Sequence, residues 1–390
     1  MPTSHRRPRP AAATAAVTAL VGIAASMTSA APAAAGPLDA TAAGPAAIAG
    51  ATTSATSPPA RTATRATSTT TALTTKAAPG ASAKRYLGTS PSRLAWFSGA
   101  WVGGDMSAAR ANRWGPWRGT PSDTTMTFPE YATWETLTKH SAWHIDTFKG
   151  FKGRLVYGLP MLPRNAKPAQ LKDVAAGKHD AVYRGIARDL RTRGRGNAIV
   201  KIGWEANGDW MSFSATAATA PTFRAAWRRI AQVMAKESPG LVLSFEVNCG
   251  TALRGQTNRL DSLTRLYPGN DVVDLVGCST YDWWITGATT EARWKTAIRP
   301  ARGPGIADVA AFARAKRKGL SISEWGLAAK SRSGNGDNPF YIRKMKQFFD
   351  ANADILVLEQ YFNEPGGMGN SLWPEAPQNP KAAAVYRQLW

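Results

Sequence analysis

Residues 198–210 read AIVKIGWEANGDW, and residues 320–326 read LSISEWG. Each stretch begins as a short run of apolar residues, which is typical of a strand buried in a parallel sheet. Each then reaches a glutamate beside Trp and Gly, Glu205 in the first stretch and Glu324 in the second. We expect both glutamates at the carboxyl ends of their strands, the end that carries the active site in a barrel of parallel strands.

Similar apolar runs recur along the chain and alternate with amphipathic segments. In residues 180–193, for example, Val182, Ile186 and Leu190 have helical spacing. We expect eight strands, at residues 94–100, 122–128, 155–162, 198–205, 241–248, 272–281, 320–324 and 355–361. Eight strands alternating with helices predict an α/β protein with the (β/α)₈ TIM-barrel fold.

The composition divides the chain into three parts. Residues 1–35 have an arginine-rich start, a short apolar stretch and small residues before Gly36, which predicts a secretory signal peptide exported by the general or the twin-arginine route. A retained N-terminal anchor is the alternative, although the apolar run is short and rich in Ala for a membrane span. Residues 36–85 are mostly Ala, Thr, Ser, Pro and Gly, which predicts a disordered linker. Residues 86–390 contain all fifteen Trp and are expected to form one catalytic barrel domain.

The formal net charge is +22, and basic residues predominate in both the tail and the expected domain. A basic surface favours anionic partners such as acidic polysaccharides, cell-wall polymers or nucleic acid. An arginine-rich composition without a specific partner explains the charge equally well. Because the sequence contains no recognisable nucleic-acid-binding module, we expect no nucleic-acid partner.

The chain contains only two cysteines, Cys249 and Cys278, near the ends of two successive predicted strands. A disulfide in an oxidising compartment and two buried free thiols are both compatible with these positions. Four histidines and the absence of Cys or His at metal-ligand spacing predict no metal site, and we expect no cofactor. We also expect a monomer without a stable membrane span.

Glu205 and Glu324 suit the hydrolysis of a glycosidic bond. That reaction needs one protonated carboxyl group to donate to the leaving oxygen and one ionised carboxylate to attack the anomeric carbon. The fourth and seventh strands of an eight-stranded barrel face each other across its mouth, so the two groups can act on the same bond. A single glutamate at a strand end is more often solvated or ion-paired, and it is the pair that carries this prediction.

Both stretches resemble the motifs of glycoside hydrolase family 26, the endo-β-mannanase family of clan A. The resemblance implies that Glu205, within Glu-x-Asn-Gly, is the general acid/base and that Glu324 is the nucleophile of a retaining enzyme. It also implies that Asn207 and Trp210 belong to the sugar site, and that Tyr281 donates a hydrogen bond to the nucleophile. The implied substrate is a β-linked extracellular polysaccharide.

Two positions depart from the family pattern. Its mannanases usually carry His immediately before the acid/base and Arg four residues before it, whereas this chain has Trp204 and Lys201. Both positions lie next to the expected cleavage site, so the sequence does not distinguish mannan from other extracellular glycans, including acidic ones, as the substrate.

Other residues near the strand ends are candidates for sugar contact, because aromatic faces pack on pyranose rings. The aromatic candidates are Trp204, Trp283, Trp325 and Tyr361, and Asp105, which follows the first predicted strand, is a candidate for lining the glycone end of the cleft. Ordinary packing at the top of the barrel is an equal alternative for each. Glu246 and Glu359 also lie late in strands, and we interpret them as binding or structural acids because neither belongs to a matching motif.

The leading hypothesis is therefore a secreted, retaining glycoside hydrolase, extracellular or associated with the cell envelope. One alternative is a non-catalytic carbohydrate- or envelope-binding barrel with a basic surface. A nucleic-acid-binding protein is a third reading, and it predicts affinity that falls steeply with salt and is independent of both glutamates.

Overall fold

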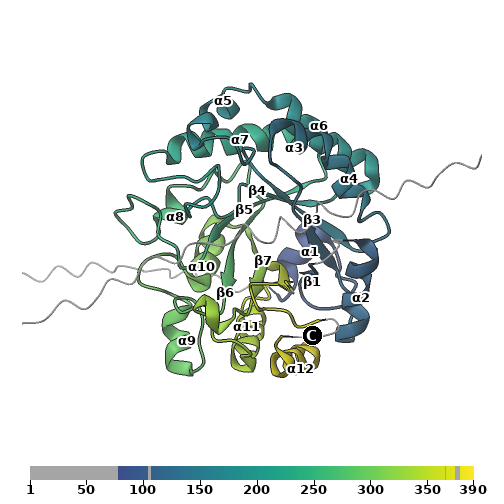
Figure 1. Ribbon diagram of the computed structural model, residues 1–390, viewed down its shortest axis with the longest axis vertical. Coiled ribbons are helices and arrows are strands. Elements are labelled where there is room, and N and C mark those ends of the chain that lie inside the picture. The colour runs from purple at the N-terminus through teal and green to yellow at the C-terminus, as the bar shows by residue number, and fades with distance from the viewer. Residues whose placement is uncertain (1–77, 104–106, 365, 374–377) are drawn as a thin grey trace, which may run out of the picture. The chain divides into compact units, whose positions relative to one another are not determined.

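The computed structural model describes residues 78–103, 107–364, 366–373 and 378–390. The predicted signal peptide, most of the predicted linker and Asp105 lie outside these residues. The strands form a closed, all-parallel barrel in the order β1-β2-β3-β4-β5-β6-β7-β8, with helices around it (Figure 1). The predicted (β/α)₈ TIM barrel is confirmed.

All eight predicted strands are present, with ends that differ by a few residues. They are β1 (Phe97–Trp101), β2 (Thr124–Thr127), β3 (Arg154–Leu159), β4 (Ile199–Ile202), β5 (Val242–Asn248), β6 (Leu275–Tyr281), β7 (Gly319–Gly326) and β8 (Leu356–Phe362). The largest difference that concerns the site is in β4, which was predicted to continue to Glu205 and ends at Ile202. Glu205 therefore lies in the turn that follows the strand.

The helices pack around the barrel and cover its strands. Their bounds are α1 (Ala81–Leu87), α2 (Ala108–Arg118), α3 (Trp134–Lys139), α4 (Ser141–Asp146), α5 (Leu171–Ala175), α6 (Asp180–Leu190), α7 (Ala220–Glu237), α8 (Asp261–Thr264), α9 (Glu291–Ala297), α10 (Ile306–Lys316), α11 (Pro339–Ala351) and α12 (Pro380–Leu389). Helix α1 begins before residue 86 because its buried Ala83 and Leu87 pack in the core, so the folded part extends into the segment predicted as linker.

Helix α7 shows how a helix supports the site. Pro221 lies in its first turn, where a missing N–H costs no helical hydrogen bond. The helix buries an apolar face at spacings of three and four residues, which includes Phe223, Trp227 and Ile230. The Trp227 indole donates a 3.0 Å hydrogen bond to the carbonyl of Ile202, the last residue of β4. The helix therefore fixes the end of the strand that leads to Glu205.

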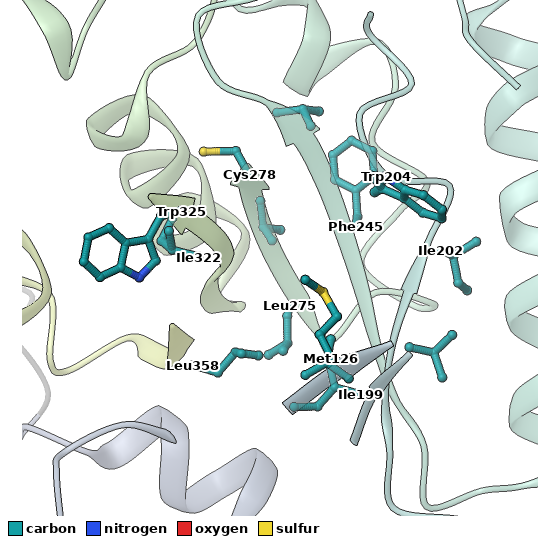
Figure 2. Packing of buried hydrophobic residues seen from close by; sticks show 14 of the residues in the cluster. Met126, Ile199, Ile202, Trp204, Phe245, Leu275, Cys278, Ile322, Trp325 and Leu358 are labelled. Atoms are coloured by element: carbon teal, nitrogen blue, oxygen red, sulfur yellow. The ribbon is translucent and has the colours of Figure 1, made fainter. Parts of the chain in front are cut away.

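The lower interior of the barrel is apolar. Met126, Ile199, Leu275 and Leu358 belong to the continuous core and come from the even-numbered strands (Figure 2). Four side chains from alternate strands form a typical layer of a TIM barrel. Two residues further along β4 and β8 lie the buried Lys201 and Gln360, so the interior becomes polar toward the carboxyl ends.

Gly277 is required by the close approach of β7. A Cβ atom at this position would lie 2.0 Å from the carbonyl oxygen of Ser321. The glycine also contributes no side chain to the interior at the level of Lys201, a buried residue of β4. The close pairing of β6 with β7 thus leaves space within the barrel for a long charged side chain.

The structure contains the disulfide between Cys249 and Cys278, with the two Cα atoms 5.6 Å apart. Cys278 lies within β6, and Cys249 directly follows β5. Of the two states compatible with the sequence, the bridged one is therefore present. It links the strands that carry Asn248 and Ser279, two residues of the site described below.

We expect reduction of this disulfide to lower the free energy of unfolding by about 3–4 kcal/mol. The bridge closes a loop of 29 residues, and chain-entropy arguments give roughly this value for such a loop. Urea unfolding with and without dithiothreitol, compared with the Cys249→Ala/Cys278→Ala variant, measures the effect. The reduced protein and the double variant should agree, and unchanged unfolding midpoints in both would contradict the expectation.

Within the described ranges, none of the helices is both long enough and apolar enough to span a membrane.

Candidate active site

The backbone after β4 adopts an unusual conformation. Gly203 and Glu205 both have φ of +55°, in the left-handed region that residues other than glycine rarely occupy. Glu205 is held there by its N–H, which donates to the carbonyl of Glu246 at 3.1 Å, and by its carbonyl, which accepts from the N–H of Gly208 at 2.9 Å. Backbone strain of this kind is frequent at functional sites and persists only where surrounding contacts impose it.

Gly203 is needed for a second reason besides its φ angle. A Cβ atom at Gly203 would lie 2.3 Å from the sulfur atom of Met161, a residue that follows β3. The Gly203 N–H also donates to the carbonyl of Leu159, the last residue of β3, at 2.9 Å. The turn is thus packed tightly against the neighbouring strand, and the position of Glu205 is fixed by the barrel.

Asn207 ties this turn to the end of β5. Its amide nitrogen donates to the carbonyls of Asn248 and Thr251 at 2.9 and 3.0 Å, and its amide oxygen accepts from the N–H of Asn248 at 2.8 Å. The prediction that Asn207 binds sugar is therefore corrected. Its buried side chain is occupied by backbone groups and supports the turn that carries Glu205.

The Glu205 carboxyl group is buried, with the residue 7% exposed. It accepts hydrogen bonds from the Trp210 indole at 3.0 Å and from the Asn248 amide at 2.9 Å, and it also interacts with the Ser279 hydroxyl. Burial, followed by the negative charge of Glu324, raises the pKa of Glu205, although Lys201 and these hydrogen bonds act in the opposite direction. A protonated carboxyl group is therefore favoured at this position.

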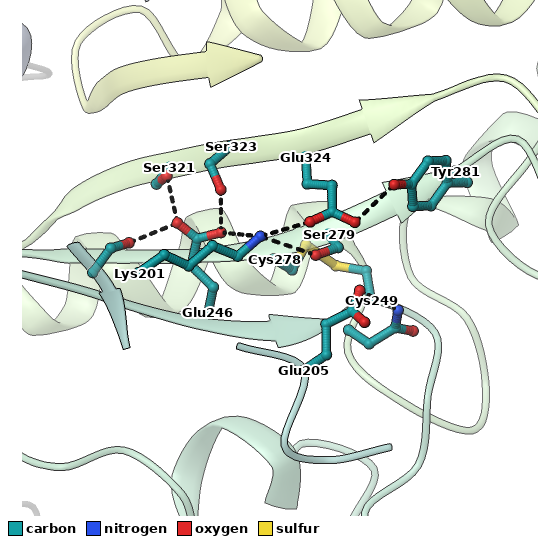
Figure 3. Close-up of polar contacts among 12 residues, drawn as sticks. Lys201, Glu205, Glu246, Cys249, Cys278, Ser279, Tyr281, Ser321, Ser323 and Glu324 are labelled. Atoms are coloured by element: carbon teal, nitrogen blue, oxygen red, sulfur yellow. Dashed lines mark hydrogen bonds and ion pairs between the residues drawn. A yellow bond between two sulfur atoms is a disulfide. The ribbon is translucent and has the colours of Figure 1, made fainter. Parts of the chain in front are cut away.

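Glu324 lies in β7, directly opposite Ser279 of β6 in the sheet register. Its two carboxylate oxygens have different donors (Figure 3). The Tyr281 hydroxyl donates to Oε1 at 2.7 Å, and Lys201 Nζ donates to Oε2 at 2.9 Å. The hydrogen bond between Tyr281 and Glu324 that the resemblance implied is thus present. Burial and the charge of Glu324 raise the pKa of Tyr281 well above its usual value, so the phenol stays neutral and donates.

Lys201 is fully buried within the barrel. Burial alone would lower its pKa, but the carboxylates of Glu324, Glu246 and Glu205 outweigh this effect and raise it. Lys201 is therefore a cation, and its Nζ lies 2.9 Å from the Glu324 carboxylate. This residue takes the place of the Arg expected from the family pattern.

The site therefore combines two carboxyl groups in different surroundings at the same barrel mouth. The environment of Glu205 favours the neutral acid, whereas Glu324 is bound by a cation and a phenol. Separation of a proton donor from an ionised carboxylate by their surroundings is how acid and nucleophile are assigned in glycosidases. Within the described residues, no cluster of three His, Cys, Asp or Glu could hold a metal ion.

The structure places two of the predicted aromatic residues beside the carboxyl groups. Trp210 donates to Glu205 and remains 41% exposed. Trp283 is partly buried and packs on Tyr281, with the ring centroids 4.8 Å apart. Both remain candidates for sugar contact.

Three other predicted sugar contacts are corrected because the side chains are buried in the core. Trp204 packs between Phe128 and Phe213. Trp325 is 0% exposed, points outward from the barrel toward α11 and α12, and its indole donates to Glu359 at 2.6 Å. Tyr361, equally buried, donates to the carbonyl of Asn370 at 2.6 Å. None offers a face to a polysaccharide, and Asp105 lies outside the described residues.

Sequence reasoning missed Asn248 and Ser279, which both contact Glu205. Asn248 is the last residue of β5, where a polar side chain after an apolar run is a usable signal. Ser279 gives no comparable signal, because its importance comes from its register with Glu324. Glu246, interpreted as a binding or structural acid, is buried inside the barrel beside Lys201.

Comparison with known proteins identifies the fold. No protein-family model and no curated protein matches the chain. A double mutant of the endo-β-1,4-mannanase of Cellulomonas fimi aligns at TM-score 0.55 with 14% identity, over 80% of this chain and 74% of the other. The catalytic domain of the family 26 endo-β-1,4-mannanase of Bacillus sp. JAMB-750 aligns at 0.54 with 14% identity, over 80% and 90%.

A fungal β-1,4-galactanase aligns at TM-score 0.51 with 13% identity, over 75% of this chain and 99% of its own. The structural neighbours thus include the family that the motifs resemble. At these identities the similarity establishes the barrel fold, and the activity has to be argued from the site.

Proposed function

We propose that this protein is a retaining glycoside hydrolase that cleaves a β-linked polysaccharide. The observation that carries the proposal is the contrast between the two glutamates at one barrel mouth. The surroundings of Glu205 favour its protonated form, whereas Glu324 is bound by Lys201 and Tyr281. The named activities of the structural neighbours, on β-1,4-mannan and β-1,4-galactan, support the same class of substrate.

In the proposed first step, Glu324 attacks the anomeric carbon while Glu205 gives its proton to the leaving oxygen. A glycosyl-enzyme ester forms, and the glycosidic bond breaks. In the second step, Glu205 accepts a proton from water, which attacks the anomeric carbon and releases Glu324. Tyr281 and Lys201 hold Glu324 in place, and Trp210 and Trp283 are proposed to contact the sugar.

The proposed location is outside the cytoplasm. A disulfide between Cys249 and Cys278 is stable in oxidising compartments, and the composition of residues 1–35 is that of a signal peptide. Residues 1–77 contain six basic residues and one acidic residue, which leaves +17 of the net +22 in the remainder of the chain. This charge supports the extension of the substrate class to acidic polysaccharides.

Reducing-end release from a panel of neutral and acidic β-linked polysaccharides tests the proposal. The full chain is compared with Glu205→Gln, Glu324→Gln and the matched surface variant Glu291→Gln, whose side chain is exposed on α9. We expect hydrolysis by the wild type and Glu291→Gln and its loss from the other two. Binding of a polysaccharide without hydrolysis would instead favour the non-catalytic carbohydrate-binding barrel.

A further inference from the structure

Glu246 of β5 is buried inside the barrel and lies beneath the proposed nucleophile (Figure 3). The hydroxyls of Ser244 and Ser321 donate to its Oε1 at 2.7 and 2.8 Å, and the hydroxyl of Ser323 donates to its Oε2 at 2.6 Å. Three buried hydroxyl donors from two strands therefore fix one carboxylate. Glu246 has no role in the two-step reaction proposed above.

Lys201 connects Glu246 to the nucleophile. Its Nζ lies 2.9 Å from Glu324 Oε2 and 3.4 Å from Glu246 Oε2, and it also donates to the Ser279 hydroxyl at 3.4 Å. One cation is thus shared by two carboxylates, with the shorter contact to Glu324. All three side chains are almost completely buried, so their charges interact with little screening by solvent.

The proposed reaction changes this balance of charge. As the bond between a Glu324 oxygen and the anomeric carbon forms, the glycosidic C–O bond breaks and the leaving oxygen takes the proton of Glu205. The ester at Glu324 has no charge, and Lys201 would then be a buried cation whose nearer partner has been neutralised. An uncompensated buried charge is strongly unfavourable.

We propose that Glu246 is a positioning residue that shares Lys201 with Glu324 in the free enzyme and becomes its counterion in the glycosyl-enzyme. The inference rests on the proposed function. In the free enzyme, sharing weakens the hold of Lys201 on Glu324, so the nucleophile stays reactive. In the intermediate, the pair of Lys201 and Glu246 remains neutral. Both effects lower the barrier to formation of the intermediate.

The groups around Lys201 and Glu246 determine how replacement of Glu246 should affect Glu324. They are Glu205 after β4, Tyr281 of β6 and Glu324 of β7, together with the serine hydroxyls of β5, β6 and β7. Removing the charge of Glu246 leaves Lys201 with Glu324 as its main partner and takes away a nearby negative charge. Lys201 should then hold Glu324 more tightly, and Glu324 should attack more slowly.

The first test is Glu246→Gln, which removes the charge and keeps the shape of the side chain. We expect the acidic limb of the pH profile of kcat/KM, measured with the polysaccharide that the wild type hydrolyses, to move to lower pH by about one unit. On the polysaccharide hydrolysed by the wild type, we expect kcat to fall about tenfold or more with little change in KM, as for loss of transition-state stabilisation.

A second variant gives the opposite sign and is less disruptive to folding. Ser323→Ala removes the hydroxyl that shares Glu246 Oε2 with Lys201, so this oxygen should draw Lys201 toward Glu246. The acidic limb of the pH profile should then move to higher pH by a few tenths of a unit. If Glu246→Gln does not fold, the direction in which the acidic limb moves in Ser323→Ala is sufficient to test the role of Glu246.

Glu359→Gln is the matched control. Glu359 is as buried as Glu246, lies on β8, which pairs with the strand of Glu324, and accepts hydrogen bonds from Ser98, Trp325 and Trp390. Its replacement should lower stability and leave the acidic limb of the pH profile unchanged. An acidic limb that is unchanged in both test variants, that moves in the same direction in both, or that moves equally in Glu359→Gln would overturn the role of Glu246. Absence of hydrolysis by the wild type on every polysaccharide would instead overturn the proposed function.

Discussion

Glu324→Gly is expected to lower hydrolysis by about 10⁴-fold or more, the scale seen when a covalent nucleophile is removed. The reason is that no other carboxylate replaces it: Glu246 lies deeper in the barrel and is held by three serine hydroxyls. The measurement is kcat/KM on an aryl β-glycoside of the sugar that the polysaccharide panel identifies.

Azide distinguishes the loss of a nucleophile from a general loss of structure. In Glu324→Gly, azide can occupy the space left by the carboxylate and attack the anomeric carbon from the same face. A β-glycoside should then give the α-glycosyl azide, because one displacement inverts the configuration. Recovery of activity without an azide product, or wild-type activity in the variant, would exclude Glu324 as the nucleophile. Glu291→Gln should behave as the wild type does.

Much of the fold could be predicted from the sequence because each strand of the barrel is a local signal. The run LVLSFEVN at residues 241–248 and the run ILVLEQY at 355–361 each predicted a strand that the structure contains. Glu205 and Glu324 could be recognised for the same reason, because each is a charged residue that follows a mostly apolar run in its own segment. The left-handed backbone of Glu205 was not foreseen, because it depends on packing of Gly203 against Met161 of another segment.

The direction of side chains near the mouth was harder to predict. Alternation along β7 is interrupted by register shifts against β8, between Leu320 and Ser321 and between Ile322 and Trp325. Ser321 and Ser323 contact Glu246 inside the barrel, and Glu324 faces the site although it directly follows Ser323. A bulge of this kind changes which residues face inward and leaves no clear trace in a single sequence.

The polar interior of the barrel depends on contacts that are distant in the chain. Lys201 is 123 residues from Glu324, and Ser323 is 77 residues from Glu246. Each of these residues taken alone is consistent with an exposed strand position. Only closure of the barrel shows that they share one buried network, which is why Glu246 could be interpreted in the sequence no further than as a binding or structural acid.

Glu205→Gln is expected to lower hydrolysis of the polysaccharide by about 10²- to 10⁴-fold, the usual contribution of general acid–base catalysis. In the wild type, Glu205 must carry its proton when the leaving oxygen departs. Burial, followed by the charge of Glu324, raises its pKa, so activity should persist toward neutral pH and fall as the pH rises past that pKa. The variant cannot lose this proton, and the basic limb of its pH profile should be absent.

The nature of the leaving group separates the two steps in which Glu205 acts. With a dinitrophenyl β-glycoside, the leaving group needs no proton, so the first step in Glu205→Ala should proceed and the glycosyl-enzyme should accumulate in a burst. Azide should then release it as the β-glycosyl azide, with the configuration opposite to that from Glu324→Gly. An α-azide from Glu205→Ala, or a basic limb retained in Glu205→Gln, would show that the proton donor is a different residue. Because Asn248 and Trp210 hold the Glu205 carboxyl group, Asn248→Ala should shift the basic limb without removing it.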